Sequence, residues 1–147
     1  MAKVVYGVCG EGLGHATRVM TIVRQLLNQH EFRIFAARDA FHYLSKHLPK
    51  HENVQLLEIP GLHFQYTGNR ISYARSLTCS IGYAWKMDRR VNQMRDALGD
   101  FNCDLAITAF EPLTARLARK QNVPLVSIDH QHFINCLDYE AASLVAI

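Results

Sequence analysis

Apolar and polar residues alternate along the chain in blocks that predict strands and helices in turn. Five apolar segments are typical of strands buried on both faces of a parallel sheet, at residues 4–8, 32–37, 54–59, 104–108 and 123–128. Between them, apolar residues recur three and four positions apart and predict amphipathic helices, beginning with Val19, Ile22, Val23, Leu26 and Leu27. The alternation predicts an α/β fold with right-handed crossovers and a parallel sheet flanked by helices.

The longest helical pattern covers residues 73–98, where we expect one long helix or two abutting helices with a bend at Gly82. Between residues 70 and 95 there are six basic side chains and a single acid, Asp88. A basic helical face suits anionic lipid headgroups or a phosphorylated acceptor, and it suits a solvated surface as well. Residues 61–71 have no clear period, so we expect a loop after the third strand.

A glycine-rich turn at residues 9–18 separates the first strand from the first helix. Ligands of open α/β sheets bind at such turns, because the helix start has unpaired N–H groups and favours negative charge. The dinucleotide pattern G-x-G-x-x-G fails at His15, and the Lys-Ser/Thr end of a P-loop is absent. What remains is glycine backbone beside an imidazole that can accept a proton near neutral pH. The alternative is that His15 only caps the helix and the glycines only form a tight turn.

Polar residues follow two later strands at the same edge of the predicted sheet. Glu111 lies at the second junction of this kind, between the fourth strand and a helix. Asp129, Gln131 and His132 follow the fifth strand. His130 and His132 are two residues apart in the sequence and able to share a metal ion, but no third ligand lies at a sequence spacing typical of metal sites. We therefore expect hydrogen-bonding roles and no metal site.

Composition limits the class of protein. The chain has 147 residues, 49% of them apolar and 20% charged, which suits one soluble domain with a core of its own. A net charge of +3 is too small to argue for a nucleic-acid partner. Four widely spaced cysteines without a C-x-x-C pair indicate free thiols in a reducing cytosol. No apolar stretch has the length of a signal or a membrane span, which predicts a cytoplasmic protein, and the apolar end at residues 141–147 predicts a truncation.

The glycine-rich turn resembles the first loop of GT-B glycosyltransferases. The resemblance is to the bacterial transferase that adds N-acetylglucosamine to a lipid-linked peptidoglycan precursor and to a related group of glycosyltransferases with a Gly-Glu-Gly-x-Gly-His-x-x-Arg form. Gly10, Glu11, Gly12, Gly14, His15 and Arg18 match that form. Residues 110–112 resemble a second motif of this group, in which an aspartate often stands where this chain has Ala109. Asp129, Gln131 and His132 resemble a third, which lines the acceptor cleft.

The resemblance implies that the chain is the Rossmann-like, acceptor-side half of a two-domain GT-B fold, and that the carboxyl-terminal nucleotide-sugar domain is absent. The implied reaction moves a sugar from a nucleotide-diphosphate sugar to an acceptor hydroxyl with inversion. His15 would be the general base, with the amides of Gly12 and Gly14 near the diphosphate. The other implied substrate-binding residues are Thr17, Arg18, Glu111, Asp129, Gln131 and His132.

The implied partners are a nucleotide sugar and a glycan or lipid-linked acceptor, with contact at the inner face of the membrane, and neither a metal nor a cofactor is implied. The isolated chain is not expected to turn over. Two alternatives stay open. One is a nucleotide- or dinucleotide-binding domain, for which Asp39 follows the second strand where a ribose-binding acid is expected. The other is a domain of a nucleotide-sugar epimerase.

Overall fold

The computed structural model describes residues 1–10, 12–60, 66–67, 70–71 and 86–128. Its elements in chain order are β1 (Lys3–Val8), α1 (Gly14–Leu26), β2 (Glu31–Ala36), α2 (Arg38–His47), β3 (Val54–Glu58), β4 (Tyr66–Thr67), β5 (Arg70–Ile71), α4 (Met87–Leu98), β6 (Leu105–Ala109), α5 (Pro112–Gln121) and β7 (Leu125–Ser127). All five strands predicted from apolar segments are present, within two residues of their predicted ends. The predicted α/β fold is confirmed.

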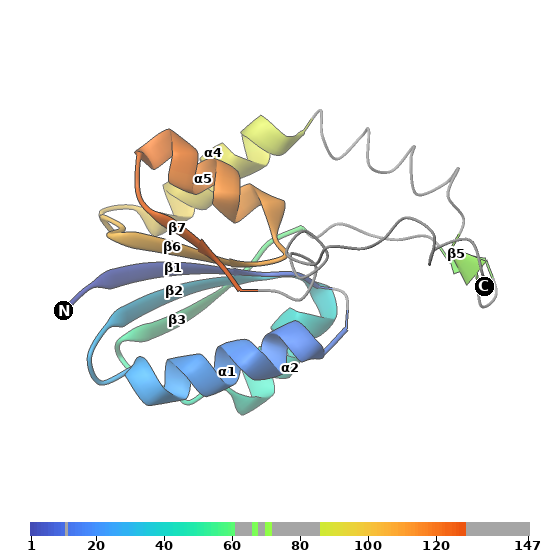
Figure 1. Ribbon diagram of the computed structural model, residues 1–147, viewed down its shortest axis with the longest axis horizontal. Helices are drawn as coiled ribbons and strands as arrows, with labels where there is room; N and C mark the ends of the chain where they lie inside the picture. Colours follow the sequence, from blue (N-terminus) through green and yellow to red (C-terminus); the bar gives the residue numbers. More distant parts are fainter. Residues whose placement is uncertain (11, 61–65, 68–69, 72–85, 129–147) are drawn as a thin grey trace, which may run out of the picture.

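The main sheet has five parallel strands in the order β3-β2-β1-β6-β7. The chain runs outward from β1 through β2 to β3, and then returns to place β6 on the other side of β1. Figure 1 shows α1 and α2 on one face of this sheet and α4 and α5 on the other. The strand order therefore reverses between β1 and β6, and open α/β sheets bind ligands at the carboxyl ends of the strands beside such a reversal.

Each face of the sheet carries its own apolar cluster, because successive side chains of a strand point to opposite faces. From β1, Val4, Tyr6 and Val8 join the cluster under α1 and α2, whereas Val5 joins Phe35 in the cluster under α4 and α5. Strands buried on both faces explain why their sequences are almost continuously apolar.

Tyr6 is the largest polar side chain in this core. Its ring is fully buried, and its hydroxyl has no hydrogen-bond partner among the residues that the structure describes. Burial raises the pKa of Tyr6 to about 12, although the positive charge of Arg18 nearby opposes the shift. The phenol is therefore neutral at physiological pH and acts as a core side chain.

One prediction is tested only in part, and another differs from the observed elements. In the pattern at residues 73–98, the described part begins at residue 86 and forms one helix, α4, from Met87 to Leu98, while Gly82 lies outside the described residues. Within the predicted loop, β4 and β5 form a short antiparallel ladder, with Tyr66 opposite Ile71. A two-residue strand is too short to show an alternation of polar and apolar residues, which is why the prediction of an unbroken loop was wrong there.

Among the described residues, Cys9 is buried, Cys103 is half-buried and neither forms a disulfide, while Cys79 and Cys136 lie outside this part of the chain. Burial raises the pKa of the Cys103 thiol. In the part of the chain that the structure covers, none of the helices is both long enough and apolar enough to cross a membrane.

Candidate functional site at the carboxyl edge of the sheet

The turn between β1 and α1 combines one glycine held in close packing with two that face open space. A Cβ atom on Gly10 would lie 2.8 Å from the carbonyl oxygen of Ala37, so a larger residue would push β1 away from the start of α2. Gly12 has a φ of +76°, which favours glycine. No described atom lies within 4 Å of the Cβ position of Gly12 or of Gly14. The turn is thus closely packed at Gly10 and open to a ligand at Gly12 and Gly14.

The amino end of α1 is open as well. Its N-cap residue, Leu13, is 48% exposed and makes no side-chain capping bond, and its first turn has no acidic residue. The Thr17 hydroxyl donates to the carbonyl of Gly14 at 3.1 Å. An uncapped helix start of this kind attracts anions.

His15 lies in the first turn of α1 and stacks on Phe110. The two ring centroids are 6.2 Å apart and the planes differ by 11°. His15 is half-buried, and Phe110, which follows β6, is 39% exposed. The stack joins the ends of β1 and β6, which are also linked by a hydrogen bond from the Cys9 amide to the Ala109 carbonyl at 3.1 Å. The predicted base therefore stands at the reversal of strand order.

Glu111 caps α5. Its carboxylate oxygens accept hydrogen bonds from the amides of Leu113 at 3.0 Å and Thr114 at 2.7 Å, and from the Thr114 hydroxyl at 2.7 Å. The residue is 4% exposed. Such bonds satisfy the first amides of a helix, and Pro112 occupies the first helical position as predicted. A contact between Glu111 and substrate stays a prediction, while the capping role is observed.

Arg18 ties α1 to the end of β7. Its Nη1 atom donates to the carbonyl of Ile128 at 3.3 Å, and the Ile128 amide donates to the Thr108 carbonyl at 2.8 Å. Arg18 is therefore directed at the point from which the chain continues to the third predicted motif. The members of that motif, Asp129, Gln131 and His132, lie outside the described residues, as does Glu11.

The structure thus brings Gly12, Gly14, His15, Thr17 and Arg18 to one helix start at the carboxyl edge of the sheet. Sequence reasoning missed Phe110 as a neighbour of His15. Its only signal was membership of the motif at residues 110–112, because the exposure and stacking of a ring cannot be read from a pattern. Among the residues with described positions, no cluster of three or more His, Cys, Asp or Glu side chains is able to hold a metal ion.

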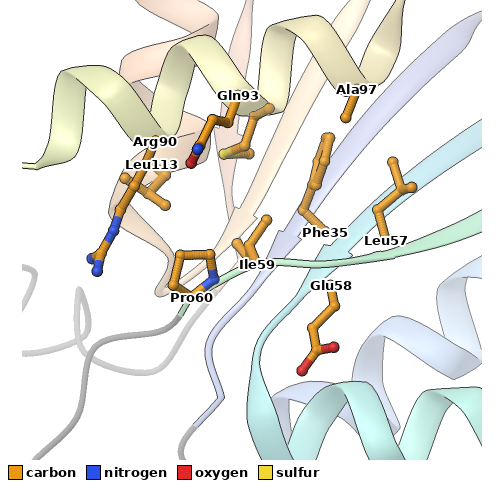
Figure 2. Close-up of a pocket in the computed structure, with 10 residues that line it drawn as sticks. Phe35, Leu57, Glu58, Ile59, Pro60, Arg90, Gln93, Ala97 and Leu113 are labelled. Carbon is orange, nitrogen blue, oxygen red and sulfur yellow. The ribbon is translucent and has the colours of Figure 1, made fainter.

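A separate cavity of about 130 Å³ lies under α4, on the face of the sheet opposite α1. Figure 2 shows Phe35 and Ile59 pointing into it from the sheet and Gln93 and Ala97 approaching from α4, while the Glu58 carboxylate points away. Arg90 and Pro60 lie at its outer end. The wall is mainly apolar, and the cavity forms no part of the edge that holds His15.

Comparison with known proteins places the chain in a family. The sequence profile of glycosyl transferase family 1 matches residues 2–146. Among curated proteins, none matches the sequence at a significant level.

Three solved structures are similar in fold. A UGT transferase from Siraitia grosvenorii in complex with UDP has a TM-score of 0.54 and 12% identity, over 87% of this chain and 28% of that one. UGT2 of Phytolacca americana, complexed with UDP-2-fluoro-glucose and pterostilbene, has a TM-score of 0.53 and 16% identity, over 87% and 30%. A carboxyl-terminal hydrogenase domain from Pyrococcus furiosus has a TM-score of 0.50 and 10% identity, over 86% and 89%. The chain thus spans less than a third of either UGT, and at these identities the likeness shows the fold alone.

Proposed function

The chain belongs to glycosyl transferase family 1, and we propose that it forms the amino-terminal, acceptor-side half of a GT-B enzyme that moves a sugar from a nucleotide-diphosphate sugar to an acceptor hydroxyl. The observation that carries this proposal is the position of His15. Its imidazole stands at an open, uncapped helix start, beside the reversal of strand order. The carboxyl-terminal half of the fold would supply most of the donor site.

The donor side of the proposal rests on the start of α1. Its amides and the exposed backbone of Gly12 and Gly14 offer donors and a positive helix end to a diphosphate, or to the charge that develops on it as the sugar leaves. The UDP bound to the Siraitia enzyme and the UDP-2-fluoro-glucose bound to the Phytolacca enzyme support a nucleotide sugar as ligand. The proposal invokes no metal or cofactor.

The proton transfer is assigned to His15. In the proposed reaction, a nitrogen of the imidazole removes the proton of the acceptor hydroxyl as its oxygen attacks the anomeric carbon, and the nucleoside diphosphate leaves from the opposite face with inversion. General-base catalysis of this kind contributes about 10²- to 10⁴-fold in rate. Thr17 and Arg18, two and three residues after His15 in α1, would contact the acceptor together with Asp129, Gln131 and His132.

We further propose that the acceptor is lipid-linked or otherwise anionic. Its support is the set of basic residues on α4 and α5, of which Arg116 and Lys120 approach Asp88 at 4.0 and 3.2 Å. All three of these side chains are exposed, so their mutual pairing contributes little to stability. The cations stay available to an anionic surface at the inner face of the membrane.

The test is an assay of the full-length polypeptide with a panel of nucleotide sugars and a glycan or lipid extract, measuring the nucleoside diphosphate released with and without acceptor. We expect release to need acceptor and to fall about 10²- to 10⁴-fold in kcat for His15→Ala. The exposed His42 on α2 provides the control, because His42→Ala removes an imidazole far from the α1 turn in sequence and should leave kcat unchanged.

Three results would contradict the proposal in different ways. Near-normal transfer by His15→Ala would remove the base. Conversion of a nucleotide sugar to its epimer without acceptor would favour the epimerase alternative. Tight binding of a dinucleotide, with no acceptor-dependent release, would favour the dinucleotide-binding alternative.

A further inference from the structure

We propose that Phe110 is a positioning residue for His15, and that the buried turn around Phe110 holds the aromatic ring where it fixes the direction of the imidazole. The inference rests on the proposed function for the role of His15 as base. Its structural part, the stack and the turn that carries it, is independent of that function and is tested separately below.

The backbone of Phe110 is strained. Its φ of +59° lies in the left-handed region, which is unfavourable for a residue with a Cβ. A positive φ is not peculiar to this turn, since Arg38, the first residue of α2, has a φ of +46°. The turn does not explain a phenylalanine, because glycine or asparagine adopts the same φ more readily.

Burial does not explain the phenylalanine either. Its side chain is 39% exposed and belongs to neither of the two apolar clusters of the core. A large aromatic residue that is both strained and exposed gains little stability from its position. The contact that accounts for it is the one with His15.

A buried set of hydrogen bonds holds both sides of Phe110. The Thr108 hydroxyl donates to the Glu111 carbonyl at 2.7 Å and accepts from the Glu111 amide at 3.0 Å. The Glu111 carboxylate is fixed in turn by the first residues of α5. Thr108 is 6% exposed and Glu111 is 4% exposed, so solvent does not compete for these bonds. The backbone that carries the ring is therefore fixed by β6 and α5 together.

Stacking suits the proposed chemistry of His15. The rings are nearly parallel, with centroids 6.2 Å apart, which is the offset arrangement that aromatic pairs favour. The nitrogen lone pair and the N–H of an imidazole lie in the plane of its ring. A partner on the face of the ring therefore limits its rotation and does not cover either nitrogen in the plane, although Nδ1 of His15 is itself buried. Because proton transfer requires a defined donor–acceptor geometry, loss of this restraint should lower kcat.

The experiment compares three substitutions at residue 110. Phe110→Asn removes the ring and relieves the backbone, Phe110→Leu removes only the aromatic face, and Phe110→Tyr keeps it. We expect kcat to fall about 10- to 100-fold for the first two and to be retained by Phe110→Tyr, with the KM for the donor within about twofold in every case. The unfolding temperature of Phe110→Asn should be equal to or above that of the unchanged protein, so that lower activity cannot be ascribed to unfolding.

A spectroscopic measurement tests the stack without relying on activity. In the NMR spectrum of the 147-residue chain, the ring current of Phe110 should displace the resonances of the carbon-bound protons of His15, and Phe110→Asn should abolish this displacement. Tyr43 and His47 on α2 form a matched pair at 4.5 Å. Tyr43→Leu should remove the corresponding shift of His47 and leave kcat unchanged.

The outcomes separate this inference from the proposed function. Full kcat in Phe110→Asn and Phe110→Leu, together with an inactive His15→Ala, would overturn the role of Phe110 and leave the transferase intact. Loss of kcat in proportion to the unfolded fraction, or His15 protons that do not respond to Phe110→Asn, would overturn it as well. Transfer retained by His15→Ala would refute the base itself, a result that the Phe110 variants do not produce.

Discussion

The junction between β1 and α1 and the junction between β6 and α5 lie side by side and solve the same backbone problem in opposite ways. Each leads from a parallel strand into a helix whose first amides lack partners within the helix. At α5, the buried carboxylate of Glu111 supplies those partners. At α1, Leu13 supplies no side-chain cap, and Gly12 and Gly14 face open space.

A helix start that is already occupied by a carboxylate of its own chain has no place for a second anion. The junction at α5 is therefore closed to anions. We infer that this rigid junction serves to hold Phe110 in place. The junction at α1 is open and has the properties of an anion site. The proposed catalytic histidine, His15, belongs to the open junction, and its ring stacks on Phe110 of the closed junction.

The closed junction depends on Gly7, and Gly7→Ala should have the largest effect on stability. A Cβ atom at residue 7 would overlap the Thr114 hydroxyl, and would lie 2.6 Å from the Thr114 Cβ and 3.1 Å from a carboxylate oxygen of Glu111. We expect the free energy of unfolding to fall by about 3 kcal/mol, because α5 and its cap must move away from β1. Urea unfolding followed by circular dichroism measures this change.

Gly14→Ala is the control at the open junction. No described atom lies within 4 Å of its Cβ position, and the residue is helical, so alanine should raise stability by about 0.5–1 kcal/mol. Equal unfolding midpoints for Gly7→Ala and the unchanged protein would show that α5 does not pack on β1 as described here.

The contrast between the junctions also shows what the sequence can and cannot predict. Long apolar runs predict strands well when both faces are buried, and the glycines and histidine at residues 9–18 marked the open junction. The closed junction gave a weaker signal, because a capping glutamate and a substrate-binding glutamate look alike before the hydrogen bonds of Glu111 are known. Glu111 was therefore predicted to bind substrate, whereas Phe110 was not included in the predicted site.

Backbone conformation explains a further part of this difference. Within the described residues, the connections β1–α1, β2–α2 and β6–α5 each have a residue with positive φ at or near the helix start, namely Gly12 at +76°, Arg38 at +46° and Phe110 at +59°. Only the positive φ of Gly12 can be predicted from the sequence, since glycine is the residue usually found in this conformation. An arginine or a phenylalanine in the same conformation is held by tertiary contacts, which no local pattern contains.

Gly12→Ala should have a smaller effect than Gly7→Ala, and of a different origin. There is room for the methyl group, but a φ of +76° disfavours any residue with a Cβ, so we expect a loss of about 1 kcal/mol in the free energy of unfolding. Gly12→Asn should lose less, because asparagine tolerates the left-handed region. Thermal unfolding of the two variants tests this order. If alanine proved as stable as glycine, the turn would not keep this conformation in solution.

Leu13→Asp should have the smallest effect on stability and the most informative effect on binding. It places a carboxylate at the N-cap of α1, where it can accept hydrogen bonds from the first amides as Glu111 does at α5. Because the backbone of Leu13 has φ −94° and ψ −10° rather than the extended form typical of caps, we expect a gain of only about 0.5 kcal/mol. Leu13→Asn, which caps without a charge, should gain about as much.

The two Leu13 variants should differ in their affinity for UDP, measured by calorimetry on the full-length polypeptide. If a diphosphate binds at the start of α1, the aspartate repels it and should weaken binding roughly five- to tenfold, whereas the asparagine should not. Equal affinities would mean that no phosphate approaches Leu13. The open junction would then be a turn without a ligand, and the difference between the two junctions would concern folding alone.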